Sequence, residues 1–288
     1  MPPGIRAPWL QWSVYGHLWL ALCIAAQAAW TARFVRGAEG VVRLAAAVAL
    51  GTFAAYGAMR LLRARDLTVQ GSAHLQWTMA RRRLLLPAVV LAALAAWWCL
   101  LPFPHDMAFW CAVIAAAAGL YVLPLRTGGG AVAGLRRVPL LKSPLIALTA
   151  ALTVVALPMQ LGTDAPSVLD VWFNTCMRMP LLLAVAITFD LRDLPVDPPG
   201  LHTLPQVFGA RGARMLAIVL VLLAALFDHV FLRNLGYATA ARTVLAGHAV
   251  SLVLIALATP RRSPLYFGLA LDGALLLVPL CGWLGTFR

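Results

Sequence analysis

The stretch PLLLAVAITFDLRDLPVDPPGLHTLPQVFG, from Pro180 to Gly209, joins an apolar run to a cluster of acids. Three of the chain's ten acidic residues, Asp190, Asp193 and Asp197, lie within eight positions of one another. Carboxylates at the C-terminal end of a helix face its negative dipole end, which is unfavourable unless they share a cation. Mg²⁺ is an ion that protein carboxylates commonly hold together with phosphate groups. The stretch therefore predicts Mg²⁺ bound by these three carboxylates and diphosphate chemistry where a membrane helix meets water.

The rest of the chain supports a polytopic membrane protein, because 62% of its 288 residues are hydrophobic. A spanning helix needs roughly 20 mostly apolar residues, and the runs are too long and too unalternating for barrel strands. We expect an all-α bundle of about nine transmembrane helices in a single domain, residues 1–288. The expected spans are His17–Phe34, Val41–Leu62, Leu84–Phe103, Met107–Leu125, Leu140–Leu161, Val168–Phe189, Met215–Leu232, Arg242–Thr259 and Tyr266–Leu284.

Basic residues predict the orientation of these spans in the cell membrane. With a cytoplasmic N-terminus, sixteen of the 23 Lys and Arg residues fall on the cytoplasmic side and six on the other, while Arg178 lies within a helix. The aspartate cluster is then cytoplasmic. The net charge of +13 is explained by this asymmetry and by contact with anionic lipid. We therefore expect membrane lipid, and no nucleic acid, as a partner.

Two connections carry further candidate binding residues. The segment RTGGGAVAGLRR, Arg126–Arg137, lacks the GK[ST] of a phosphate-binding P-loop, which favours an ordinary flexible loop. Beyond it, Arg136, Arg137 and Lys142 can reach anionic groups at the interface, or can simply extend toward water from the membrane.

The residues around the three aspartates predict the local backbone and a charge partner. Pro195 and Pro198 disfavour helical backbone before them, so we expect the helix to end near Asp193 and the loop to fold Asp197 back. Arg192 either neutralises Asp193 or contacts a ligand phosphate. The alternative for the whole cluster is a solvated helix end with an Arg–Asp pair.

Ionisable residues inside apolar runs are costly in lipid and suggest function. Asp272 can pair with Arg178, or either residue can line an acceptor pocket. For His17 and His248 we favour structural hydrogen bonds.

The segment DLRDLPVDPPGLHTLPQVFG, Asp190–Gly209, resembles the second aspartate motif of the UbiA-type intramembrane prenyltransferases. That motif is D-x-x-D-x-x-x-D, followed by T-L-P and an apolar run with glycine. A second segment, YVLPLRTGGGAVAGLRRVPLLKSP, is similar to the family's Tyr–Pro and basic segment, which implies that Tyr121 belongs to the site. The resemblance implies a UbiA-like helical bundle whose two aspartate motifs face each other and hold Mg²⁺ ions that bridge a prenyl diphosphate.

The chain departs from this family at the first motif, N-D-x-x-D-x-x-x-D. The corresponding stretch is AAYGAMRLLRARDLTVQ, Ala54–Gln70, with Asp66 as its only acid. Arg60 and Arg63 lie three residues apart, on one helical face, and guanidinium groups bind phosphate oxygens bidentately. We expect them to replace part of the missing motif, although the positive-inside rule alone also explains them.

Two functions compete at this stage. The first is a prenyltransferase, which moves an isoprenoid group from a prenyl diphosphate to a lipophilic acceptor with Mg²⁺ assistance. The second is a non-catalytic UbiA-like protein that binds a polyprenyl phosphate or another anionic lipid, and the missing first motif favours it. A transporter is a weaker third choice, since no repeats or broken helices are evident.

Overall fold

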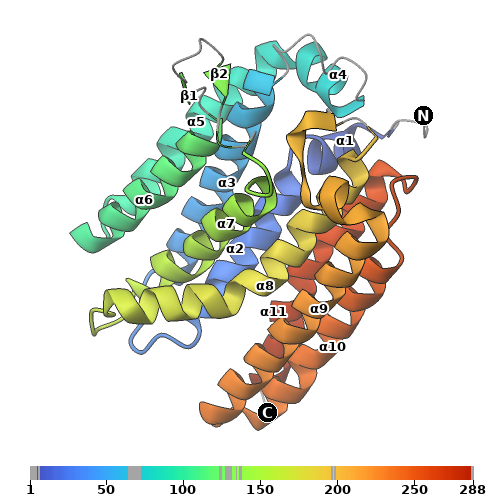
Figure 1. Cartoon of the computed structure of the whole chain (residues 1–288). Helices are drawn as coiled ribbons and strands as arrows, with labels where there is room; N and C mark the ends of the chain where they lie inside the picture. Colours follow the sequence, from blue (N-terminus) through green and yellow to red (C-terminus); the bar gives the residue numbers. More distant parts are fainter. Residues whose placement is uncertain are drawn as a thin grey trace.

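The structure is a computed structural model of the 288-residue chain. It describes residues 5, 7–63, 73–122, 125–126, 132–133, 135, 138–195, 197 and 199–286. Figure 1 shows long helices that lie side by side, with α1, α4 and the short β1–β2 pair at one end of the bundle. We call this end the motif end.

The elements follow one another through short connections. In chain order they are α1 (Pro8–Val14), α2 (Leu18–Ala32), α3 (Val41–Arg63), α4 (Ala73–Ala80), α5 (Arg82–Leu100), α6 (His105–Val122), β1 (Leu125–Arg126), β2 (Val132–Ala133), α7 (Lys142–Met159), α8 (Val168–Asp193), the 3₁₀ turn η3 (Pro199–Leu201), α9 (Leu204–Asn234), α10 (Ala238–Ala256), the π-helical turn η4 (Tyr266–Leu271) and α11 (Asp272–Thr286).

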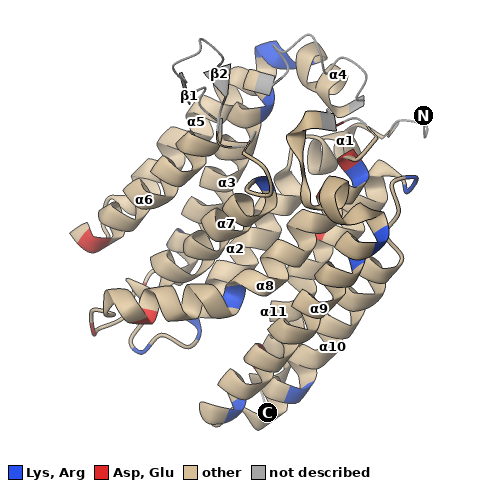
Figure 2. Cartoon of the chain, in the orientation of Figure 1, with Lys and Arg blue, Asp and Glu red and all other residues tan. Residues whose placement is uncertain are grey.

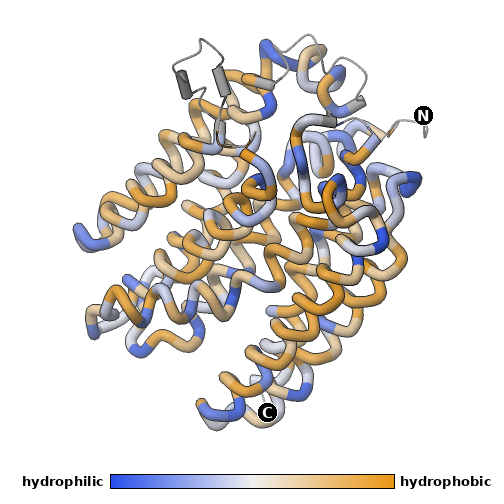
Figure 3. The backbone as a smooth tube through the Cα atoms, in the orientation of Figure 1, coloured by the Kyte–Doolittle hydropathy of each residue, from blue (hydrophilic) through white to orange (hydrophobic). Residues whose placement is uncertain are grey.

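Each expected span corresponds to an apolar helix, but the count of nine transmembrane helices is not confirmed. Among the described residues, seven helices are long and apolar enough to cross a membrane, while α2 and α6 are apolar but shorter. Large apolar side chains such as Leu91, Trp98 and Leu226 point outward from the bundle, where lipid replaces water as the solvent. Figure 3 shows the hydrophobic length of the helices and their more hydrophilic ends. The chain is a multi-pass membrane protein.

The central helix α2 packs against α3, α7 and α11, and most other neighbours in space are neighbours in sequence. The core contains fully buried large side chains, including Trp30, Leu152, Leu181 and Phe267. A Cβ on Gly282 would lie 2.4 Å from the ring of Trp30. Glycine at this position therefore lets α11 approach α2 closely.

Two connections that the apolar pattern predicts as loops contain helices. Residues 204–214 form the start of α9, and α4 lies between α3 and α5. Helix α9 begins early because Gln206 Oε1 accepts a hydrogen bond from the Thr203 N–H, 3.1 Å, with Pro205 in the first turn. Gly209 has φ 71° and ψ 164°, a backbone conformation restricted essentially to glycine. The glycine thus separates this first turn from the apolar body of α9.

Candidate functional site

The aspartate cluster lies at the C-terminal end of α8. The helix ends at Asp193, as the two prolines predict. The loop then turns back, because the N–H of Asp197 donates to the carbonyl of Asp193 at 2.8 Å. This local fold gives the three carboxylates a common location.

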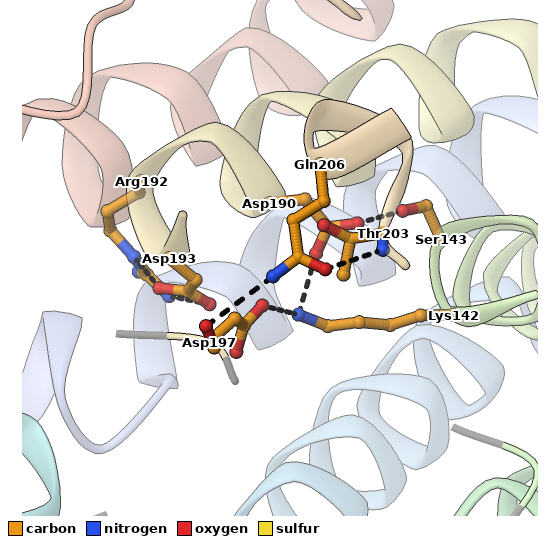
Figure 4. A network of polar contacts seen from close by, with 8 residues as sticks. All are labelled: Lys142, Ser143, Asp190, Arg192, Asp193, Asp197, Thr203 and Gln206. Carbon is orange, nitrogen blue, oxygen red and sulfur yellow. Dashed lines mark hydrogen bonds and ion pairs between the residues drawn. The ribbon is translucent and has the colours of Figure 1, made fainter. Parts of the chain in front are cut away.

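Lys142, the first residue of α7, lies between two of these carboxylates. Its Nζ is 2.8 Å from Asp190 Oδ1 and 2.8 Å from Asp197 Oδ2. Ser143 donates a second hydrogen bond to Asp190. Figure 4 shows the lysine reaching from α7 toward both acids. Lys142 and Asp190 are only 8% and 3% exposed. The ammonium group therefore neutralises the negative charge of carboxylates that are largely shielded from water.

The third carboxylate pairs with its own neighbour. Arg192 donates to both oxygens of Asp193, at 2.7 and 3.1 Å. Its guanidinium carbon also lies 4.9 Å from the ring centroid of Phe189 and 5.8 Å from that of Phe267. The paired and stacked arrangement holds Arg192 in one orientation. Of the two sequence alternatives, the structure therefore shows Arg192 neutralising Asp193.

Unusual backbone conformations hold the loops beside this cluster. Leu140 and His202 both have positive φ, 63° and 48°, and the N–H of Leu140 donates to the His202 carbonyl at 3.1 Å. Gln206 Nε2 contacts the Asp197 carbonyl at 3.4 Å, as seen in Figure 4. Strained residues of this kind persist only where their surroundings impose them, often at ligand sites. The two connections before α7 and α9 are thus fixed against each other.

The carboxylates border a cavity of about 380 Å³, which we call the mouth cavity. It lies between α2, α3, α7, α8 and the η4–α11 segment. Its lining includes four basic residues and three acidic ones: Arg60, Lys142, Arg192, Arg262, Asp190, Asp193 and Asp272. In Figure 2 most charged residues lie toward the ends of the bundle. The mouth cavity therefore brings charge together inside a mostly apolar protein.

A second cavity, of about 310 Å³, adjoins the first. We call it the apolar chamber, because aliphatic and aromatic side chains of α3, α5, α6 and α7 form most of its wall. The two cavities share six lining residues: Ile24, Tyr56, Met59, Tyr121, Ile146 and Ala150. A compartment with charged groups therefore lies beside an apolar one.

The sequence-predicted site residues fall into three groups. The cluster gathers Lys142 and Arg192 with the three aspartates, and Arg60 and Tyr121 line the mouth cavity. Three others, namely the side chain of Arg63 and residues Arg136 and Arg137, lie outside the described residues. Ser143 was not predicted, and its position beside the chain's only lysine was its only signal.

Of the two alternatives for Asp272 and Arg178, the pairing of these residues with each other is wrong. Arg178 Nη1 lies 3.1 Å from Asp228 Oδ1, and His248 Nε2 lies 2.9 Å from Asp228 Oδ2. These three residues, from α8, α9 and α10, form what we call the mid-bundle triad. The triad gives His248 the structural partner that we favoured, whereas His17 and Asp272 both line the mouth cavity.

The arrangement of the carboxylates does not favour a shared metal ion. Asp190 and Asp197 face the Lys142 ammonium, and Asp193 faces Arg192. Within the part of the chain that the structure describes, no group of three or more His, Cys, Asp or Glu side chains is placed to hold a metal. An ammonium already lies between two of the predicted ligands, so this donor set does not fit Mg²⁺ as it stands. Binding of Mg²⁺ by the three aspartates stays a prediction.

Comparison with known proteins identifies the fold. No protein-family model matches the chain, and no curated protein matches it significantly. Among solved structures, the apo structure of a UbiA homolog from Aeropyrum pernix K1 matches with a TM-score of 0.67. The match covers 94% of this chain and 97% of the other, at 15% sequence identity. The chain therefore has the UbiA-type fold that its second aspartate motif predicted.

Proposed function

We propose that this chain, which has the fold of a UbiA homolog, is an intramembrane prenyltransferase with its motif end toward the cytoplasm. The observation that carries the proposal is the adjacency of the two cavities, which share six lining residues. A prenyl diphosphate has a charged head and a long apolar tail, and the mouth cavity and apolar chamber offer a matching pair of environments. Such convergence of a few polar groups on an apolar cavity is typical of ligand sites.

The diphosphate would lie among the basic groups of the mouth cavity. Arg60 offers a planar fork of N–H donors that suits phosphate oxygens. Lys142 has three N–H donors and two carboxylate partners, so it can donate to a phosphate while it holds Asp190 and Asp197. The four basic lining residues only slightly outnumber the three acidic ones. Tight binding of a diphosphate therefore requires the cluster to shift its partners or to take up a further cation.

The reaction requires no nucleophile from the protein. As the bond between prenyl C1 and the diphosphate oxygen breaks, its electron pair leaves with the diphosphate. Arg60 and Lys142 would stabilise the charge that develops there. An atom of the lipophilic acceptor then bonds to C1 and loses its proton to the released diphosphate. The apolar chamber would keep water from the cationic prenyl group.

A second candidate function follows from Lys142 itself. Because this lysine compensates Asp190 and Asp197 without added metal, the chain can be a non-catalytic protein that binds a polyprenyl phosphate in the same cavities. The missing first aspartate motif favours this candidate as well. The two functions share a ligand class and differ in whether the C1–O bond breaks.

Purified full-length protein in detergent, given farnesyl diphosphate, distinguishes them. We expect saturable binding and release of pyrophosphate, measured with Mg²⁺ and again with EDTA in its place. In EDTA, Lys142→Met should reduce both signals, whereas the exposed Arg261, which lies outside both cavities, provides the matched control Arg261→Met. Binding without pyrophosphate release would favour the second candidate. No binding at all would overturn both.

A further inference from the structure

Three arginines lie at the motif end of the neighbouring helices α9 and α10. Arg211 and Arg214 are three residues apart in α9 and share one helical face, while Arg262 follows the end of α10. Figure 2 shows basic residues at this end of the helix pair. Arg262 also lines the mouth cavity, but Arg211 and Arg214 line neither cavity. The two α9 arginines therefore lie outside the proposed prenyl diphosphate site.

The C-terminal end of α10 holds two of these guanidinium groups close together. Arg214 Nη1 donates to the Ala256 carbonyl at 3.4 Å, and Arg262 Nε donates to the Leu257 carbonyl at 3.2 Å. Leu257 keeps helical backbone, and carbonyl oxygens of successive helical residues lie roughly 4 Å apart. The two donating nitrogens thus lie within about 11 Å of each other. The other N–H groups of each guanidinium extend this reach, so one phosphate group can accept hydrogen bonds from both.

An aromatic residue orients Arg262. The guanidinium carbon of Arg262 lies 5.2 Å from the ring centroid of Tyr266. The hydroxyl of Tyr266 in turn donates to the Leu254 carbonyl, one turn before the end of α10. Stacking on an aromatic ring favours a fixed orientation of a guanidinium group. The end of α10 therefore fixes both arginines and Tyr266 through its own carbonyl groups.

Helix capping explains only part of this arrangement. Arginine side chains often donate to the last carbonyls of a helix, and such bonds use one nitrogen each of Arg214 and Arg262. Nε of Arg214 is buried and has no hydrogen-bond partner within the described structure, which is costly. Among the described residues, no acidic side chain forms an ion pair with Arg211, Arg214 or Arg262. The unused donors and the uncompensated charge point to an anion from outside the chain.

The surface beside the arginines is apolar. Met215 directly follows Arg214 and is exposed, as are Val219 of α9 and Val253 and Leu257 of α10. In a membrane-spanning helix pair such side chains contact hydrocarbon. Guanidinium groups at the edge of a lipid-facing apolar surface suit a ligand with an anionic headgroup and hydrocarbon tails.

We infer that Arg211, Arg214 and Arg262 form a binding site for the headgroup of an anionic phospholipid in the leaflet at the motif end. The lipid phosphate accepts charge-assisted hydrogen bonds from the guanidinium groups, and the acyl chains lie along α9 and α10. A zwitterionic phospholipid carries the same phosphate without a net negative charge, so it binds more weakly. This site goes beyond the proposed prenyl transfer and does not depend on it.

Native mass spectrometry of the full-length chain in detergent tests the site with two probes, dioleoylphosphatidylglycerol and dioleoylphosphatidylcholine. Each arginine near an anionic headgroup contributes a factor of about five in affinity. We therefore expect the wild type to bind phosphatidylglycerol at least about 25-fold more tightly than phosphatidylcholine. The double variant Arg211→Gln with Arg214→Gln should lose most of this preference. Unchanged affinity for phosphatidylcholine shows that the variant is folded.

The matched control is the double variant Arg233→Gln with Arg242→Gln. It removes the same charge from exposed positions at the other ends of α9 and α10 and should keep the preference. Equal losses in both double variants, or no preference in the wild type, would overturn the site. Displacement of phosphatidylglycerol by equimolar inorganic phosphate would overturn it as a lipid site. Displacement by equimolar farnesyl diphosphate would place the lipid in the mouth cavity and overturn the separate site.

Discussion

The protein holds two polar networks in an apolar bundle, and they are built differently. The motif-end cluster of Lys142, Asp190 and Asp197 borders a cavity. The mid-bundle triad of Arg178, Asp228 and His248 joins α8, α9 and α10, and its residues line neither cavity described above. Both networks pair charges, but of the two only the first borders one of the two cavities described above. Charge inside a membrane protein therefore indicates a binding site only where the fold also leaves room.

The largest effect that this comparison predicts is a loss of protein stability when the triad is broken. Asp228→Leu leaves Arg178, whose side chain is only 10% exposed, without its counter-ion, so the free energy of unfolding should fall by about 3–5 kcal/mol. Chemical unfolding in detergent micelles measures this change.

The double variant Arg178→Met with Asp228→Leu is its control. Replacement of a buried ion pair by apolar side chains is often close to neutral, so the double variant should recover most of the loss. If Asp228→Leu lowers the free energy of unfolding by less than about 1 kcal/mol, as for an exposed ion pair, the triad contributes little to stability.

The second prediction concerns metal at the motif-end cluster. Lys142→Met removes the ammonium from between Asp190 and Asp197, so the variant should gain a site for Mg²⁺. An ion at a hundred times its Kd would stabilise the folded variant by about 2.7 kcal/mol. Melting temperatures with and without MgCl₂ measure this, with Arg261→Met as the matched control. Equal stabilisation of the wild type would mean that Mg²⁺ displaces Lys142 and that the aspartates hold it as the sequence predicts.

The third prediction concerns the arginine that stands in the place of the first aspartate motif. Arg60→Ala should weaken binding of farnesyl diphosphate by roughly 1.5–3 kcal/mol, the range for a charged hydrogen bond. Affinity for farnesol should hardly change, because the lost contact is to phosphate. Arg60→Asp should bind the diphosphate less well than Arg60→Ala. Equal losses of affinity for farnesol and for farnesyl diphosphate would show that Arg60 does not contact the phosphate and only helps to orient the chain in the membrane.

The smallest effect is expected at the other end of α8. Ser167 Oγ accepts from the Asp170 N–H at 3.1 Å, and Asp170 accepts from the Ser167 N–H in return. Ser167→Ala should lower the free energy of unfolding by about 1 kcal/mol and leave ligand binding unchanged. A change in farnesyl diphosphate affinity would show that the start of α8 is coupled to its aspartates.

Local sequence predicted much of the bundle and part of the site. Apolar runs gave the approximate positions of the helices, and Pro195 and Pro198 correctly placed the end of α8 at Asp193. The same runs missed the first turns of α9, because residues 204–214 include Gln206, Gly209 and two arginines, and the helix start is marked by a hydrogen bond from the Thr203 N–H to Gln206 Oε1. Helix starts depend on capping groups that a hydropathy pattern does not register.

What the sequence by itself determined is a membrane protein of apolar helices with three aspartates at one helix end. Only the tertiary structure decided which charges meet. Lys142 reaches Asp197 from 55 positions away, and Arg178 pairs with Asp228 from 50 positions away, while Asp272 remains without the arginine that the sequence suggested. Ion pairs between helices depend on how each helix is rotated and packed against its neighbours. Side chains far apart in sequence set that packing together, so the partners follow from the fold and not from local spacing.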